Sequence, residues 1–378
     1  MVNQTGKPIN QSLQMKYSYF FFAGFLLMLN SCFDSPKKSD TSTEPSVETK
    51  ELQSTVYASD VIPFFDHWKL ILGDGSNAGI ATDFENKDFF YTTNDGKTEW
   101  VVFKSPNGGD THGTSNNTRT ELAQIKKWYP KTADDKLSAT LKVMNVSATG
   151  DARVASTHSV VVGQIHSADA FENEPLKIFY KKFPGHTKGS VFWHYEINTA
   201  GDDNSKRWDY STAVWGHDFS VVGTDENTYP AEPSEGIELG EEFSYEILVT
   251  DGIMSLKFTS EGHETKTFTK NLIKSEYTTK ADIPEQTQKL FVPIGQDGVE
   301  RESAYSGEGC FFKLGCYNQT NGKSPEVNKN WCSGAETHGG DIQKQYADGN
   351  YAEVWFKTGS ISVSEAAVSN EGYFTKND

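Results

Sequence analysis

The sequence is poor in positive charge and in cysteine, and these shortages narrow the classes of protein to which it can belong. Its 378 residues include 35 Lys and Arg against 52 Asp and Glu, which gives a formal net charge of −17. This balance argues against a nucleic acid as partner, because phosphate binding needs a basic surface. Net charge describes the whole surface, however, so it does not exclude a locally basic cleft for another polyanion.

Motifs for metals, nucleotides and serine nucleophiles are also lacking. The sequence contains no H-E-x-x-H, no clustered Cys/His set, no acidic calcium loop, no G-x-S-x-G, no phosphate-binding loop and no dinucleotide fingerprint. We therefore expect neither a metal site nor a cofactor. Two carboxylates could still meet in space as in a glycosidase, but no pair of acids stands out in the sequence.

Long apolar runs are lacking too, and a short one of about 13 residues lies near the N-terminus, at residues 17–29. This length is too short to span a bilayer and fits the core of a signal peptide. The run ends at Leu29-Asn30-Ser31-Cys32, which resembles a bacterial lipobox. We therefore expect residues 1–31 to be a lipoprotein signal peptide and Cys32 to carry the lipid. An ordinary signal peptide with an incidental cysteine is the alternative.

The next segment, residues 32–56, is rich in Ser, Thr, Glu, Lys and Pro and has few large apolar residues. Such a composition predicts a flexible tether. We expect residues 57–378 to form one domain, because no second linker or internal repeat follows. The predicted protein is an exported monomer of the outer membrane that touches the membrane only through its lipid.

Three cysteines follow the tether, at positions 310, 316 and 332. An exported protein can oxidise two of them, which would leave one free thiol. The sequence alone does not choose the pair. We favour a disulfide between Cys316 and Cys332, which would hold a loop to the strand before it.

The globular part shows the pattern of short β-strands. Asn94-Asp95-Gly96 separates the apolar segments 89–93 and 98–103, and Asp251-Gly252 separates 243–249 and 253–258, as in β-hairpins. Further strands are expected at three places, residues 137–143, 191–197 and 351–357. Helical periodicity is weak. Many short strands with turns between them predict an all-β sandwich or barrel.

The first candidate functional segment is Arg119-Thr120-Glu121-Leu122. Strand alternation places Arg119 and Glu121 on one face. Taken alone, the segment is explained better by an exposed strand that carries an ion pair.

The second segment is SVVVGQIH, residues 159–166. Strict alternation places Gln164 and His166 on one face together with Val160 and Val162. A lone histidine usually has a structural role. A His and a Gln next to each other on one face of an otherwise apolar strand are unusual, however.

The third segment is FFKLGCYNQ, residues 311–319. Alternation places Lys313, Tyr317 and Gln319 on one face with Gly315, and the residues between them on the other. A face with these side chains is typical of ligand binding, although a solvated strand face would also carry them.

Taken together, RTEL, QIH and FFKLGCYNQ resemble, in that order, the three signature segments of the alginate lyases of polysaccharide lyase family 7. The residues Ala58–Pro63 also resemble the start of that family, and the resemblance covers roughly residues 57–360. It implies a concanavalin-like jelly-roll β-sandwich with a concave substrate groove. It also implies cleavage of 1,4-linked uronates by β-elimination, without a cofactor.

The resemblance and the chemistry of the reaction assign roles to individual residues. Arg119 and Gln164 would neutralise the substrate carboxylate, His166 would be the base for guluronate, and Tyr317 would be the acid. For mannuronate, Tyr317 could be both acid and base. Substrate-binding residues would be the remaining polar members of the motifs, namely Glu121, Lys313, Asn318 and Gln319.

Two positions depart from the family pattern. Ala123 stands where a second arginine is usual, so one cation is missing and subsite affinity is expected to differ. Phe311 replaces a tyrosine, which removes only a hydroxyl group.

Two other functions remain open on the sequence. One is a non-catalytic lipoprotein that binds polysaccharide at the cell surface, and the other is a lyase for another polyuronate such as a glucuronan. Within the lyase interpretation we expect exolytic action and a preference for guluronate. The reason for exolytic action is that the long segments 201–236 and 320–348 could close one end of a groove.

Overall fold

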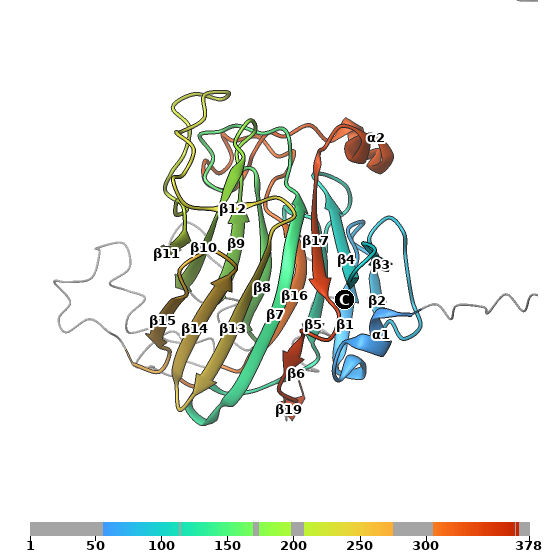
Figure 1. Ribbon diagram of the computed structural model, residues 1–378, viewed down its shortest axis with the longest axis vertical. Helices are drawn as coiled ribbons and strands as arrows, with labels where there is room; N and C mark the ends of the chain where they lie inside the picture. Colours follow the sequence, from blue (N-terminus) through green and yellow to red (C-terminus); the bar gives the residue numbers. More distant parts are fainter. Residues whose placement is uncertain are drawn as a thin grey trace, which may run out of the picture. The chain divides into compact units, whose positions relative to one another are not determined.

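Two antiparallel sheets stacked face to face make up most of the described chain (Figure 1). The computed structural model describes residues 56–112, 115–168, 174–197, 208–274, 305–366 and 368–369. The predicted signal peptide, Cys32 and most of the tether lie outside these residues. No helix within them is long and apolar enough to cross a membrane.

The nine-stranded sheet has the order β11-β10-β9-β8-β16-β5-β1-β2, and β12 pairs with β10. Its strands are β1 (Trp68–Ile71), β2 (Asn77–Gly79), β5 (Arg119–Gln124), β8 (Ser159–Ser167), β9 (Leu176–Lys181), β10 (Lys188–Ile197), β11 (Trp208–Trp215), β12 (Ile237–Glu238) and β16 (Cys310–Asn318).

The eight-stranded sheet has the order β15-β14-β13-β7-β17-β4-β3, and β18 pairs with β7. Its strands are β3 (Phe90–Asn94), β4 (Glu99–Pro106), β7 (Asp134–Asn145), β13 (Glu242–Thr250), β14 (Ile253–Ser260), β15 (Lys266–Asn271), β17 (Tyr351–Lys357) and β18 (Ser362–Val363). A separate small sheet pairs β6 (Lys126–Lys127) with β19 (Val368–Ser369).

Helical segments are few and short in the described residues. They are α1 (Ala58–Val61), α2 (Ile342–Ala347) and the 3₁₀ turns η1 (Phe65–His67), η2 (Pro130–Thr132) and η6 (His338–Gly340). Both predicted hairpins are confirmed as β3–β4 and β13–β14. In the second, Asp251 and Gly252 have φ angles of 49° and 82°, as a tight hairpin turn requires. Strands distant in sequence lie side by side, such as β16 between β8 and β5, and the predicted jelly-roll sandwich is confirmed.

The core fills the space between the two sheets. One face of each long strand supplies it, with large buried side chains such as Trp68, Phe103, Tyr245 and Phe356. Complete burial of one such side chain contributes about 2–3 kcal/mol. The opposite face of the nine-stranded sheet, which we call its outer face, carries polar side chains together with two smaller apolar clusters.

A bulge in β8 changes the predicted faces of that strand. Val160 and Val162 point into the core, whereas Val161 lies on the outer face with Gln164 and His166. The prediction that both valines share the face of His166 was therefore wrong. The strand pairing shifts between Val161 and Gly163, and one extra residue reverses the alternation beyond it. A Cβ at Gly163 would lie 2.8 Å from the Tyr245 hydroxyl, so the inward position needs glycine.

The predicted disulfide between Cys316 and Cys332 was also wrong. Cys310, Cys316 and Cys332 are all buried free thiols. Alternation along β16 turns Cys316 into the core between the sheets, where Ser105 donates a hydrogen bond to its carbonyl oxygen. Cys332 lies in the loop that follows β16, outside this core. The two thiols are therefore in different surroundings and form no disulfide.

Candidate active site

The three motif segments are the adjacent central strands β5, β16 and β8 of the nine-stranded sheet. Lys313 of β16 lies directly opposite Gln164 of β8, and Tyr317 lies opposite Arg119 of β5. Phe311 lies opposite His166. Because directly opposed residues share a face, the register gathers the predicted catalytic residues on the outer face.

Glu121 is the centre of the polar network on this face. Its side chain is only 2% exposed, and its carboxylate lies 3.0 Å from Lys313 Nζ and 3.4 Å from the Arg119 guanidinium. Gln164 donates its amide N–H to the second oxygen. Burial raises the pKa of Glu121, but the two cations outweigh this, and the net pKa lies below its usual value.

Glu121 therefore stays ionised and orients the three donors around it. This placement does not fit the predicted direct contact with substrate, because a buried carboxylate would repel a uronate. The negative charge instead fixes the side-chain positions of Arg119, Lys313 and Gln164. These donors then have a defined geometry before any substrate arrives.

Tyr317 is half-buried at the edge of this network. The Arg119 guanidinium lies 3.8 Å from the centre of the phenol ring, in a cation–π contact. The Ser115 hydroxyl lies 3.2 Å from the phenolic oxygen. Ser115 was not predicted as a site residue, and its only signal was its position shortly before the first motif.

His166 has one ring nitrogen committed to the backbone. Nδ1 lies 2.6 Å from the carbonyl oxygen of Ser167. A carbonyl only accepts hydrogen bonds, so Nδ1 carries the proton and Nε2 keeps a lone pair. Nε2 lies 3.5 Å from Glu174 Oε1, and Phe311 stacks on the ring at 5.2 Å.

Burial lowers the pKa of His166 to about 4, although the Glu174 carboxylate acts in the opposite direction. Lys313 and Arg119 add to the lowering. The ring is therefore neutral at neutral pH and can accept a proton at Nε2. Glu174, which was not predicted, would stabilise the imidazolium that forms.

Asn318 does not lie on the outer face, and its predicted contact with substrate was wrong. Its amide nitrogen donates to the carbonyl oxygens of Ser105 and Pro106 and to the side chain of Asn107. Its side-chain oxygen accepts from the backbone N–H of Thr320. All these groups belong to the connection between β16 and β4, so Asn318 has a structural role.

Gln319, the residue after β16, is almost completely buried and donates weakly to the carbonyl oxygen of Tyr317, at 3.4 Å. Its predicted role in substrate binding stays a prediction.

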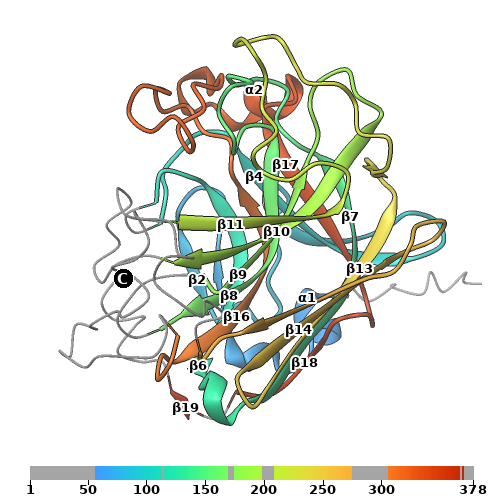
Figure 2. The same ribbon diagram turned by 90° about the vertical axis from the view of Figure 1, so that its left-hand side faces the viewer.

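An aromatic wall, which we define as Phe219 and Trp331, covers the outer face beyond Tyr317. The two rings lie 5.0 Å apart and pack over Phe179 of β9 and Phe192 of β10. Tyr317 packs against the same cluster. The loop between β11 and β12 and the loop after β16, which carry these two residues, lie at the same end of the sandwich as α2 (Figure 1 and Figure 2).

The sequence placed both long segments, 201–236 and 320–348, at one end of a groove. Phe219 and Trp331 belong to these segments, but sequence analysis did not single them out. The residues 201–207 lie outside the described part. The signal that could have identified these two residues in the sequence is a large aromatic residue within an otherwise polar loop.

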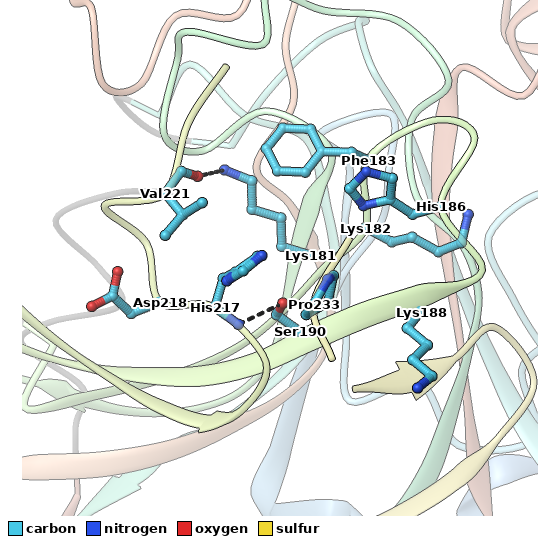
Figure 3. Close-up of a pocket in the computed structure, with 10 residues that line it drawn as sticks. All are labelled: Lys181, Lys182, Phe183, His186, Lys188, Ser190, His217, Asp218, Val221 and Pro233. Atoms are coloured by element: carbon cyan, nitrogen blue, oxygen red, sulfur yellow. Dashed lines mark hydrogen bonds between the residues drawn. The ribbon is translucent and has the colours of Figure 1, made fainter. Parts of the chain in front are cut away.

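The loop that carries Phe219 is fixed to the sheet from below (Figure 3). Lys181 of β9 donates from Nζ to the carbonyl oxygens of Ala155, at 2.7 Å, and Val221, at 3.4 Å. The backbone N–H of His217 donates to Ser190 Oγ of β10, at 2.9 Å. These bonds attach the loop that carries Phe219 to β9 and β10.

Buried charges under the wall are paired. Lys177 of β9 lies 2.7 Å from a Glu196 oxygen and 3.1 Å from a Glu174 oxygen. Its Nζ lies 5.6 Å from the centre of the Trp331 ring. Pairing is needed here, because an isolated buried charge is strongly destabilising.

Comparison with known proteins agrees with this geometry. The family model described as alginate lyase matches residues 62–363. An alginate lyase from Klebsiella pneumoniae is 27% identical over 280 residues, which cover 65% of this chain and 76% of that protein. The crystal structure of the same organism's alginate lyase is 22% identical, with a TM-score of 0.54 over 80% of this chain and 96% of its own, and supports the fold alone.

The crystal structure of the exolytic PL7 alginate lyase AlyA5 from Zobellia galactanivorans is more similar. It is 61% identical and has a TM-score of 0.74. The match covers 82% of this chain and 99% of that one. The chain therefore belongs to the alginate lyases of polysaccharide lyase family 7.

Proposed function

We propose that the protein is an exolytic alginate lyase that prefers guluronate and releases products with a 4,5-unsaturated uronate end. One observation carries this proposal. Strand register brings Arg119, Gln164, His166 and Tyr317 together on one face, in a chain of the alginate lyase family.

The first requirement of the reaction is to neutralise the uronate carboxylate. Removal of the C5 proton places negative charge next to a group that is already anionic. Arg119 offers a positive charge with a planar fork of donors, and Gln164 offers an amide N–H. Glu121 holds both side chains in place, so little reorganisation is needed as charge develops.

Proton transfer is the second requirement. His166 Nε2 takes the C5 proton of a guluronate, the C5–H electrons form the C4=C5 double bond, and the C4–O4 bond breaks. Tyr317 gives its phenolic proton to the departing O4. In guluronate the proton and leaving group are on opposite faces of the sugar, which fits two separate groups. In mannuronate they share a face, and Tyr317 serves in both roles.

Exolytic action follows from the place of the aromatic wall. Phe219 and Trp331 cover β9 and β10 directly beside Tyr317, so a polymer bound at Tyr317 cannot continue in that direction. The related AlyA5 is described as exolytic, which supports the same mode here.

A time course of product sizes tests the proposal. We expect small unsaturated products from the earliest times on pure guluronate blocks, and slower release from mannuronate blocks. Ultraviolet absorbance of the new double bond and size separation of the products are the measurements. Glucuronan serves as the comparison substrate, and faster cleavage of it would contradict the substrate assignment.

Opening the wall is expected to change the product profile. In a Phe219→Ala/Trp331→Ala double variant, longer oligosaccharides should appear early and outnumber the smallest product, because a chain can then cross β9 and β10. Trp355→Ala, on the eight-stranded sheet, is the matched control. An unchanged profile in the double variant would show that the wall does not set the cleavage mode.

The acid dependence of activity should follow the buried histidine. The pKa of His166 is lowered to about 4, so the ring stays neutral as pH falls through 6.5, its ordinary value. We expect kcat/KM on polyguluronate to fall only below about pH 5. In the unfolded chain His166 binds a proton at its ordinary pKa of about 6.5, above its pKa in the folded protein. The free energy of unfolding should therefore decrease as pH falls below about 6.5. An activity limb centred near pH 6.5 would contradict this.

We also propose that the enzyme is exported and anchored by a lipid on Cys32. The support is the short apolar run at residues 17–29 and the lipobox-like sequence that ends at Cys32. Metabolic labelling with a fatty acid tests it. Incorporation that is lost in Cys32→Ser supports the anchor, and incorporation unaffected by the substitution refutes it.

A further inference from the structure

The acid of the proposed reaction needs a group that stabilises its anion. When Tyr317 gives its proton to the departing O4, the phenol becomes a phenolate. The Arg119 guanidinium, 3.8 Å from the centre of the ring, supplies positive charge over the ring face. The charge of a phenolate is concentrated at its oxygen, however, and a hydrogen-bond donor directed at that oxygen stabilises it more directly.

Ser115 can supply this donor. Its hydroxyl oxygen lies 3.2 Å from the phenolic oxygen, and the contact joins residues that are 202 positions apart in the sequence. Both side chains are partly exposed, so the pair lies where a substrate can reach the phenol. A serine hydroxyl both donates and accepts hydrogen bonds, whereas a carbonyl or carboxylate oxygen only accepts them. Ser115 can therefore bond to the phenol and to the phenolate.

The other hydrogen bonds of Ser115 leave this choice open. The backbone N–H of Asn117 donates to Ser115 Oγ at 3.1 Å, and this bond occupies one lone pair. The hydroxyl proton can reach the carbonyl oxygen of Asn117, also at 3.1 Å, or the phenolic oxygen of Tyr317. The proton can turn from one acceptor to the other by rotation about the Cβ–Oγ bond. No heavy atom has to move.

Buried polar groups hold the segment that carries Ser115. Thr111 Oγ1 donates to the carbonyl oxygen of Ser115 at 2.7 Å. Asn117 is 6% exposed, and its side-chain oxygen accepts from the amide nitrogen of Asn321 at 2.6 Å. The same nitrogen donates to the carbonyl oxygen of Trp331 at 2.7 Å. Because this buried network is satisfied in the free protein, Ser115 is in place before a substrate binds.

We propose that Ser115 is a positioning residue that assists proton transfer from Tyr317 by hydrogen-bonding its phenolate. In the free enzyme the phenol donates to Ser115, and Ser115 donates to the carbonyl oxygen of Asn117. When substrate binds, the phenolic proton turns to O4 and the serine hydroxyl donates to the phenolic oxygen instead. This bond strengthens as the proton moves to O4, because its acceptor becomes an anion. No covalent bond to Ser115 forms or breaks, and the inference rests on the proposed lyase function.

Mannuronate should depend on the same hydroxyl at least as strongly. On this substrate Tyr317 takes the C5 proton before it gives one to O4, so it begins the step as a phenolate. Ser115 then donates to the phenolic oxygen from the start of the step.

The decisive variant is Ser115→Ala, which removes the hydroxyl and little else. We expect kcat on polyguluronate to fall about 10–100-fold, the usual effect of a lost hydrogen bond to a charged group, and kcat on polymannuronate to fall at least as much. KM should change little, because Ser115 bonds to the phenol and not to the sugar. Ser115→Thr keeps a hydroxyl and should recover most of kcat. Initial growth of ultraviolet absorbance is the measurement.

Ser147→Ala is the matched control. Ser147 forms the same local turn as Ser115, because its Oγ donates to the carbonyl oxygen of Thr149 at 2.8 Å and accepts from the Thr149 N–H at 3.2 Å. Its further partner is the Asn107 amide, at 2.6 Å, and not a tyrosine. This variant should lower the thermal unfolding temperature and keep kcat. Thermal unfolding of each variant shows that it is folded at the assay temperature.

A double variant tests whether Ser115 acts through the phenol. Once Tyr317→Phe has removed the phenolic oxygen, Ser115→Ala should lower kcat no further, because there is no phenolate to stabilise. Residual rates are compared in long incubations at high enzyme concentration. A further 10-fold loss in the double variant would refute the inference.

The outcomes separate this inference from the proposed function. If the unaltered enzyme forms no unsaturated product from any polyuronate, the lyase function itself fails. If it is active and Ser115→Ala keeps its kcat, or changes only KM, the role of Ser115 is refuted alone. A loss of kcat that Ser115→Thr does not recover also refutes it. A loss that Ser115→Thr recovers, and that Ser147→Ala does not show, supports it.

Discussion

Tyr317→Phe is expected to lower kcat on both polyguluronate and polymannuronate by at least about 10²–10⁴-fold, the usual contribution of a positioned acid or base. The substitution removes one hydroxyl and leaves the ring, so the contact with Arg119 at 3.8 Å remains. Without the phenolic proton, O4 would leave as an unprotonated alkoxide. Because Tyr317 has both roles on mannuronate, that substrate should be affected at least as strongly.

The measurement is initial growth of ultraviolet absorbance, together with oligoguluronate binding by calorimetry. Binding should change little, because Arg119, Gln164 and Lys313 keep their places around Glu121. Tyr351→Phe, a half-buried tyrosine on β17 of the other sheet, is the control and should keep full activity. Unreduced activity of Tyr317→Phe would remove this residue from the reaction.

His166→Asn is expected to separate the two substrates. On polyguluronate, loss of the base should lower kcat by about 10²–10⁴-fold. On polymannuronate the loss should be smaller, because Tyr317 lies on the side of both the proton and the leaving group. The asparagine can keep a polar contact at the place of Nδ1, which donates to the carbonyl oxygen of Ser167.

His158 provides a matched control for this experiment. It too is buried, its pKa is lowered to about 4 by burial, and its Nδ1 lies 2.7 Å from a backbone carbonyl oxygen, that of Ser147. Its φ angle is +60°, which asparagine tolerates. His158→Asn should lower the thermal unfolding temperature without changing the ratio of the two activities. Equal losses on both substrates in His166→Asn would contradict the assigned role.

Much of the site was predictable because strand alternation and turns depend on short stretches of sequence. Alternation along β16 correctly separated Lys313 and Tyr317 from Phe312, Leu314 and Cys316. The turn residues Asn94-Asp95-Gly96 and Asp251-Gly252 marked both hairpins. These features depend on the period of two and on turn chemistry, which a short stretch of sequence contains.

Other features depend on contacts between distant segments. The bulge at Gly163 reversed the faces of β8, because the fit of Gly163 against Tyr245 decides where the extra residue goes. Glu121 is the centre of the polar network because the fold places Lys313 of β16 and Gln164 of β8 next to it. A sequence pattern on β5 cannot contain this information.

By itself, the sequence determined the strand-rich architecture and the family, and it predicted Arg119, Gln164, His166 and Tyr317 as the catalytic residues. The tertiary structure decided that Cys316 faces the core, that Asn318 ties β16 to β4, and that Phe219 and Trp331 close one side of the site. The physical reason is the jelly-roll order itself. Neighbouring strands in each sheet come from distant parts of the chain, and the loops that cover them have no periodic pattern to read.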